Sequence, residues 1–233
     1  MKSVVFRLIC YDVVMKKLFL ASSGLEYIQT FIGKDPSQVR MLFIPTAGNL
    51  DENIWWIDKD RDVLDDMGFQ ITELDIAVEP YEGFETALKN SDIVYVAGGN
   101  TFYLLKQLRD KGFDKLLTEY VDKGLLYAGA SAGALIAGLD IEPVSTIDEP
   151  EKVEGLTSTK GLGWVNIVPI PHYDMTARTK AIDDIKEKYK SRYEIVLLTD
   201  DDALVVEGDS WKKVESKRSA LEKKWFEANH DNM

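Results

Sequence analysis

Short apolar stretches typical of β-strands alternate along this chain with stretches whose apolar residues recur at helical spacing. Strands are expected at 17–21, 41–44, 70–74, 92–96, 125–129, 167–170, 195–198, 203–207 and 211–214. Helices are expected at 25–32, 51–66, 83–90, 101–109, 113–122 and 177–190, and another is expected to begin at Ala132. Such alternation indicates a mostly parallel sheet that is covered by helices on both faces. The pattern therefore predicts a doubly wound, three-layer α/β fold.

Size and charge narrow the range of partners. The 233 residues, 45% of them hydrophobic, suit a single domain over 1–233, and no linker composition marks a second one. The net charge of −12 argues against binding to nucleic acid or to anionic membranes. No apolar run approaches the roughly 20 residues that span a bilayer. We expect neither a nucleic-acid nor a membrane partner, and a monomer or homodimer.

Cysteine and histidine are scarce, which limits cofactor chemistry. The chain has one cysteine, Cys10, and two histidines, His172 and His230. A single cysteine cannot form an intramolecular disulfide, and this usage suits a reducing cytoplasm, where we expect the protein. A multi-histidine zinc site is nearly excluded. We therefore expect no metal and no cofactor.

The two ends of the sequence differ from the rest. Residues 1–14 lean apolar but lack a small-residue cleavage site, and Met15-Lys16-Lys17 leads directly into a predicted strand. We expect Met15 to be the true start and 1–14 to be an extension. The charged segment 219–233 is expected to be a peripheral tail, helical in part.

The sequence G-A-S-A-G at 129–133 lies between a predicted strand and a predicted helix. This is the context of a nucleophile elbow, a tight turn that needs small neighbours and exposes the serine at the end of a sheet. Ser131 is therefore the candidate nucleophile. A small-residue turn that only packs a helix on a strand is the structural alternative.

A second small-residue stretch, G-G-N-T at 98–101, also joins a strand to a helix. Glycine lets a backbone N–H face a site without a side chain in the way. We expect the N–H groups of Gly99 and Ala132 to form an oxyanion hole. The complete nucleotide-binding patterns G-x-G-x-x-G and G-x-x-x-x-G-K-S/T are absent, so nucleotide binding is a weaker interpretation of this stretch than an oxyanion hole.

A serine hydroxyl needs a base before it can act as a nucleophile. His172 follows the strand predicted at 167–170, so it can reach the same sheet edge as Ser131. His230 lies in the polar tail, a poor place for a precisely held base. His172 is therefore the expected base.

A base of this kind is usually oriented by a carboxylate. The acidic turn between two predicted strands offers Asp200, Asp201 and Asp202, and Asp174 lies nearer to His172 in the sequence. The residues alone leave the choice among these four open.

Three motifs taken together resemble a known family: A-G-G-N-T-F at 97–102, G-A-S-A-G at 129–133 and P-H-Y at 171–173. In order and spacing they are similar to peptidase E, the aspartyl dipeptidase, and its relative cyanophycinase. The resemblance extends over about 17–208. It implies the fold of class I glutamine amidotransferases, which is flavodoxin-like, with serine in place of the cysteine nucleophile.

The resemblance also implies roles for individual residues. Ser131 would attack the scissile carbonyl, His172 would act as general base and then general acid, and Asp200 would complete the triad. The family's oxyanion donors fall on Gly99 and Ala132.

Peptidase E cleaves dipeptides with an N-terminal aspartate, and the resemblance extends to its substrate site. Asp148 would pair with the α-amino group, Arg178 would bind the aspartate carboxylate, and Asn100 would belong to the same site. Ala130 stands where a bulky aromatic residue is expected in peptidase E itself. The resemblance therefore supports the hydrolase chemistry more strongly than the aspartyl specificity.

The sequence thus predicts a cytoplasmic serine exopeptidase that cleaves short peptides, possibly Asp-X dipeptides, through an acyl-enzyme. Two alternatives stay open. One is an esterase or other acyl hydrolase on the same site, although the order serine, histidine, acid differs from that of α/β-hydrolases. The other is a non-catalytic binding module of the same fold.

Overall fold

The computed structural model describes residues 15–229. The extension expected at 1–14 and the histidine at position 230 lie outside the described residues. Within 15–229, no helix combines the length and the apolar character that crossing a membrane requires.

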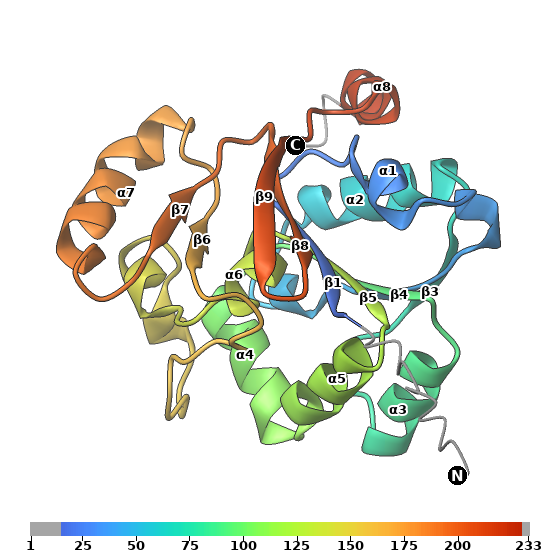
Figure 1. Cartoon of the computed structure of the whole chain (residues 1–233), viewed down its shortest axis with the longest axis horizontal. Coiled ribbons are helices and arrows are strands. Elements are labelled where there is room, and N and C mark those ends of the chain that lie inside the picture. Colours follow the sequence, from blue (N-terminus) through green and yellow to red (C-terminus); the bar gives the residue numbers. More distant parts are fainter. Residues whose placement is uncertain (1–14, 230–233) are drawn as a thin grey trace, which may run out of the picture.

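A seven-stranded sheet with the order β3-β2-β4-β5-β1-β8-β9 forms the centre of the protein (Figure 1). Five strands run parallel: β1 (Lys17–Ala21), β2 (Arg40–Ile44), β3 (Gln70–Glu73), β4 (Ile93–Val96) and β5 (Leu126–Ala130). The hairpin of β8 (Asp202–Glu207) and β9 (Ser210–Glu215) adds antiparallel strands beside β1. The prediction of a mostly parallel sheet is confirmed.

Helices cover both faces of this sheet, as the alternation predicted. On one face lie α1 (Ile28–Ile32), α2 (Trp55–Asp66) and α8 (Ala220–Asn229); on the other lie α3 (Tyr81–Lys89), α4 (Thr101–Asp110), α5 (Phe113–Asp122) and α6 (Ala132–Ile136) (Figure 1). Alternate residues of a strand point to opposite faces. In β1, Leu18 and Leu20 belong to one hydrophobic core, and Phe19 and Ala21 to the other. Two cores separated by one sheet make the three-layer architecture.

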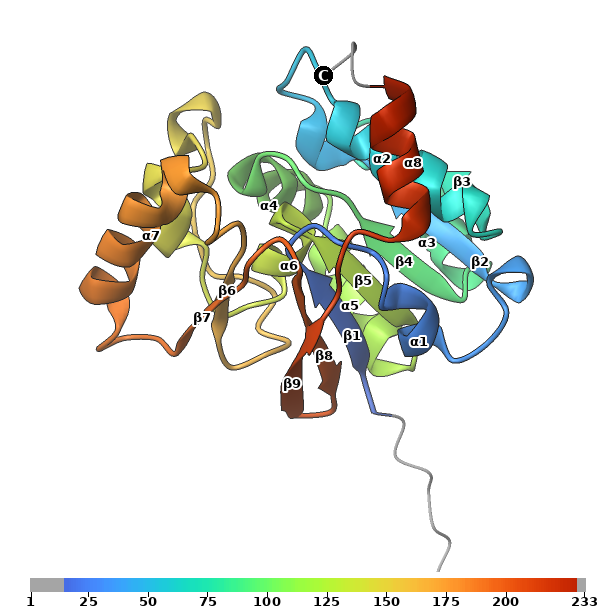
Figure 2. The ribbon, with the colours of Figure 1, turned by 90° about the horizontal axis from the view of Figure 1, so that it is seen from above.

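The two strands β6 (Val168–Ile170) and β7 (Ile195–Leu197) form a small parallel sheet of their own. Together with α7 (Thr176–Tyr189), which connects them, they lie to one side of the central sheet (Figure 2). The sequence indicated these strands but not their separation from the main sheet. The arrangement matters for function because the chain leaving β6 leads directly to His172.

Four short 3₁₀ helices complete the described chain: η1 (Pro36–Gln38), η2 (Thr46–Gly48), η3 (Glu142–Thr146) and η4 (Pro150–Lys152). Asp148 lies between η3 and η4, and η2 packs against Gly99, which follows β4. The segment expected to be a peripheral tail forms α8, which packs against α2 and buries Glu222 completely.

Candidate active site

Ser131 joins β5 to α6 in a strained conformation. Its φ of 50° and ψ of −106° lie in a region that residues other than glycine rarely adopt. The turn is held by the Ser131 N–H, which donates to the carbonyl of Ala21 at 3.0 Å, and by the Ser131 carbonyl, which accepts from the first turn of α6. Such strain, held by the surrounding hydrogen bonds, is expected of an elbow that presents a side chain.

The glycines around Ser131 are required by close packing. A Cβ on Gly129 would lie 2.5 Å from the carbonyl carbon of Gly133, and a Cβ on Gly133 would lie 2.2 Å from the carbonyl oxygen of Val96. Both distances are far shorter than any ordinary contact. The helix α6 can therefore begin beside β4 and β5 only because both positions carry glycine.

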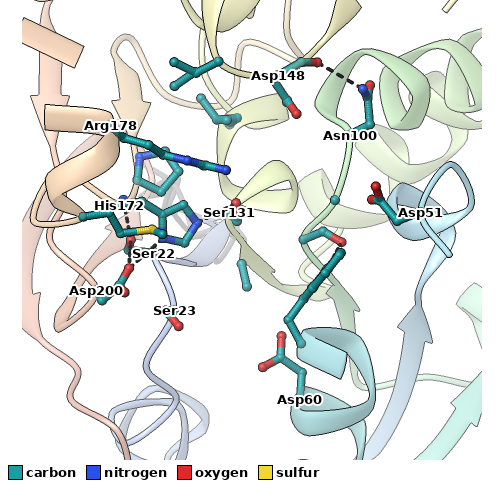
Figure 3. A pocket seen from close by; sticks show the side chains of 18 of the residues that line it. Ser22, Ser23, Asp51, Asp60, Asn100, Ser131, Asp148, His172, Arg178 and Asp200 are labelled. Carbon is teal, nitrogen blue, oxygen red and sulfur yellow. Dashed lines mark hydrogen bonds and ion pairs between the residues drawn. The ribbon is translucent and has the colours of Figure 1, made fainter. Parts of the chain in front are cut away.

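His172 lies against Ser131 just beyond the end of β6. Its Nε2 is 3.0 Å from the Ser131 Oγ, which is hydrogen-bonding distance (Figure 3). The backbone of His172 has a positive φ of 63°, and its N–H donates to the Ser22 hydroxyl at 2.9 Å. These constraints direct the imidazole at Ser131.

Asp200 is the acid that contacts the imidazole, with 2.6 Å between its Oδ1 and the His172 Nδ1. The other three acids have different partners. Asp174 accepts from the Asp200 N–H, Asp202 accepts from Thr199 and pairs with Lys213, and Asp201 is exposed. Burial raises the pKa of Asp200, but contact with His172 and the charge of Arg218 outweigh it and hold this pKa below its usual value. Asp200 therefore stays ionised and able to orient the histidine.

Ser22 is a site residue that the sequence analysis did not identify. Its hydroxyl accepts from the His172 N–H and donates to the Asp200 Oδ1 at 3.4 Å. It directly follows β1, which neighbours β5, so its position at the same sheet edge was the available signal. Ser22 joins the backbone of the histidine to the carboxylate that orients it.

Of the two residues expected to form an oxyanion hole, Ala132 directly follows Ser131 and Gly99 lines the same pocket as Ser131. Ala132 is the first residue of α6, so its N–H has no acceptor within the helix. Gly99 makes no backbone hydrogen bond within the described part of the chain. Its φ of 143° and its approach to η2, where a Cβ would lie 2.3 Å from the Ala47 carbonyl, both require glycine.

Ser131 and His172 open into a pocket of about 390 Å³, which Asp148, Arg178 and Asn100 also line (Figure 3). All three residues expected at a substrate site are therefore brought to the same cavity. Asn100 is already engaged by the protein, because its Oδ1 caps α4 at the Tyr103 N–H and its Nδ2 donates to the Asp148 carbonyl at 3.0 Å. Its amide holds the loop that carries Asp148.

Asp148 is a carboxylate with an unusual acidity. Burial raises its pKa to about 6, although contact with Thr101, whose N–H donates to the carboxylate at 2.8 Å, and the charge of Arg178 act in the opposite direction. At neutral pH the group is mostly ionised but poorly solvated. A cationic group that binds next to such a carboxylate stabilises its ionised form.

The raised pKa of Asp148 predicts a pH-dependent stability cost. The folded-state value of about 6 exceeds the ordinary 3.8, so ionised Asp148 destabilises the fold above pH 6, and this cost vanishes as the pH falls toward 4. Asp148→Asn, which keeps an acceptor for the Thr101 N–H, should add about 1 to 2 kcal/mol to the free energy of unfolding at pH 7.5. Urea titrations of both proteins at several pH values measure this difference.

The same titrations need a control acid in the pocket. Asp51 is exposed, and Asp51→Asn should change stability by no more than about 0.5 kcal/mol. A difference between wild type and Asp148→Asn that stays constant from pH 4 to 7.5 would contradict the raised pKa.

No group of three or more histidine, cysteine, aspartate or glutamate side chains suited to a metal ion occurs within residues 15–229. The polar contacts around Ser131 are made instead among a hydroxyl, an imidazole and a carboxylate.

A serine at a strand–helix elbow, contacting a histidine that contacts an aspartate, on a doubly wound sheet, defines the class of serine hydrolases. The chain belongs to peptidase family S51, whose family model matches residues 18–214. The protein is therefore a serine peptidase, as its sequence predicted.

Individual relatives agree with this assignment. An uncharacterised peptidase of Listeria monocytogenes is 34% identical over 206 residues, which cover 88% of this chain and 99% of that protein. Peptidase E of Shigella flexneri is 36% identical over 135 residues, or 57% of this chain and 54% of that one. The crystal structure of a candidate peptidase E protein from Listeria monocytogenes EGD-e superposes with a TM-score of 0.80 at 32% identity, covering 86% of this chain and 98% of that one. The resemblance to peptidase E and the predicted fold are both confirmed.

Proposed function

We propose that this peptidase removes the N-terminal residue from short peptides, dipeptides that begin with aspartate foremost, through an acyl-enzyme on Ser131. The observation that carries the proposal is the continuous contact from Ser131 through His172 to Asp200, three residues that line one pocket. The volume of about 390 Å³ suits a small ligand rather than a long chain.

The proposed reaction begins when the Ser131 Oγ attacks the scissile carbonyl carbon and His172 Nε2 takes the hydroxyl proton. The carbonyl oxygen becomes an oxyanion facing the N–H groups of Gly99 and Ala132. His172 returns the proton to the leaving nitrogen, the C–N bond breaks, and the acyl group remains as an ester. A water that His172 deprotonates then attacks this ester and releases the acid and Ser131. Asp200 orients the imidazole throughout.

Recognition of the N-terminal residue rests on the charges beside Ser131. Asp148, ionised above pH 6 and half-buried, suits the α-amino group of the substrate. Arg178, on the neighbouring helix α7, suits a side-chain carboxylate, because a guanidinium can bind both of its oxygens. A substrate with an N-terminal aspartate presents both groups.

Arg178→Gln should lower kcat/KM for Asp-X dipeptides by about 10- to 100-fold and leave Ala-X cleavage nearly unchanged, since one charge-assisted contact is lost only with the former. Steady-state kinetics on Asp-Leu and Ala-Leu measure this. The matched control is Lys180→Gln, which removes an exposed charge from the same helix. Equal losses of kcat/KM for Asp-Leu and Ala-Leu would show that Arg178 does not bind the side-chain carboxylate of the substrate.

The direct test of the proposed function is a dipeptide panel with N-terminal Asp, Glu, Asn, Ala or Leu, combined with fluorophosphonate labelling and peptide mapping. We expect a fluorophosphonate adduct on Ser131 and fastest cleavage of the Asp-X members. Cleavage of other members in preference would overturn the aspartyl specificity alone. Hydrolysis of aryl esters without cleavage of any peptide would overturn the proposed substrate class.

A further inference from the structure

A cation–aromatic pair from the C-terminal segment lines the same pocket. Arg218 lies between β9 and α8, and its guanidinium carbon is 4.5 Å from the centre of the Phe226 ring on α8. The Phe226 ring in turn contacts Trp55 edge-on, with 5.9 Å between ring centroids. Both Arg218 and Phe226 follow residue 214, where the match to the family model ends. They therefore lie outside the segment that the family model matches.

The cations of the pocket fall into two groups. Lys59 pairs with two buried carboxylates, and Lys152 pairs with Glu149 at 2.7 Å. Arg178 and Arg218 form no salt bridge with any residue in the range 15–229. These two guanidinium groups are therefore the pocket's charges left to bind an anionic ligand.

The two arginines lie near different parts of the site. The charge of Arg178 lowers the pKa of Asp148, and the charge of Arg218 lowers the pKa of Asp200. Figure 3 shows Asp148 and Asp200 on opposite sides of Ser131. Arg178 on α7 is assigned above to the N-terminal residue, so Arg218, from the segment between β9 and α8, is left for the other end of the substrate.

We propose that Arg218, held against Phe226, binds the free C-terminal carboxylate of the substrate and so makes the enzyme selective for dipeptides. This inference rests on the proposed function, because it names the residue that binds the C-terminal end of the same dipeptide substrate. An Asp-X dipeptide carries one ammonium and two carboxylates. The pocket offers Asp148, Arg178 and Arg218 as the three groups of opposite charge.

Stacking prepares Arg218 for this role. A guanidinium whose face covers an aromatic ring keeps its N–H edge free, and that edge matches the two oxygens of a carboxylate. In a dipeptide the carboxylate is borne by the residue whose nitrogen leaves, one Cα step of about 3.8 Å from the N-terminal residue. A longer peptide would place a further residue where Arg218 and Phe226 stand.

The test compares Asp-Leu with Asp-Leu-amide, which differ only in the terminal charge. Wild type should cleave the free acid at least about 10-fold faster in kcat/KM, mainly through KM. Arg218→Gln should abolish that preference, so that the ratio of kcat/KM for acid over amide falls to about 1, and Arg218→Lys should restore part of it. Lys217→Gln is the matched control, because it removes the adjacent charge, which pairs with Glu215 at the surface.

The outcomes separate this inference from the proposed function. Equal cleavage of acid and amide by wild type, with a fluorophosphonate adduct on Ser131, would overturn the role of Arg218 and leave the peptidase mechanism intact. A loss in Arg218→Gln that is equal for both substrates would also overturn it. Failure of wild type to cleave either substrate would overturn it as well, and the labelling of Ser131 would then report on the mechanism separately.

Discussion

Ser131→Ala should lower kcat for the best dipeptide substrate by about ten-thousandfold to a millionfold, with KM changed only several-fold. Without the hydroxyl, no acyl-enzyme forms, and only binding and oxyanion stabilisation can accelerate the attack of water. The distance of 3.0 Å between the Ser131 Oγ and the His172 Nε2 is the geometric basis of this expectation. Steady-state kinetics at high enzyme concentration, together with mass spectrometry for a trapped acyl-enzyme, measure the effect.

Ser23→Ala is the matched control for this variant. Ser23 lines the same pocket, but within residues 15–229 its hydroxyl forms no hydrogen bond with the His172 imidazole, whereas the Ser131 hydroxyl does. The control should retain kcat within about threefold. Residual activity above about 1% in Ser131→Ala, with the fold preserved, would contradict the assignment of Ser131 as nucleophile.

The parts of the site that were predictable are those fixed by local sequence. The turn at 129–133 needs small residues because α6 begins in close contact with β4 and β5. The small residues in the sequence therefore indicate a tight turn at this point. Gly99 is constrained in the same way by its contact with η2. The alternation of apolar strands with amphipathic helices likewise predicted the three-layer fold. A strand in a sheet covered by helices on both faces must be apolar on both faces.

Contacts between distant segments could not be predicted in this way. The choice of Asp200 over its neighbours depends on how the turn before β8 meets the chain leaving β6, and that separation is 28 residues. Ser22 joins the same cluster from 150 residues away from His172. Lys59 and Asp60 are buried, and nothing in the charged sequence of α2 indicates that α8 will pack against them.

Lys59→Met should lower the free energy of unfolding by about 3 to 5 kcal/mol at neutral pH. Lys59 lies between two buried carboxylates, at 2.6 Å from Asp60 and 3.1 Å from Glu222, and only 3% of it is exposed. Removing the cation would leave these acids together in the core. Burial already raises the pKa of Asp60 above its usual value in spite of the Lys59 charge and the hydrogen bond from Tyr95. Urea unfolding measures the loss.

The double variant Lys59→Met/Glu222→Gln separates charge from packing. Glutamine keeps acceptor capacity for the N–H groups of Leu25 and Ser219 but removes one of the two negative charges. If uncompensated charge causes the loss, the double variant should be more stable than Lys59→Met alone by about 1 to 2 kcal/mol, a coupling that independent sites do not show. Lys223→Met, on the exposed side of α8, should stay within about 0.5 kcal/mol of wild type. Strict additivity in the double variant would mean that Lys59 supports α8 by packing alone, and that its charge does not hold this helix against α2.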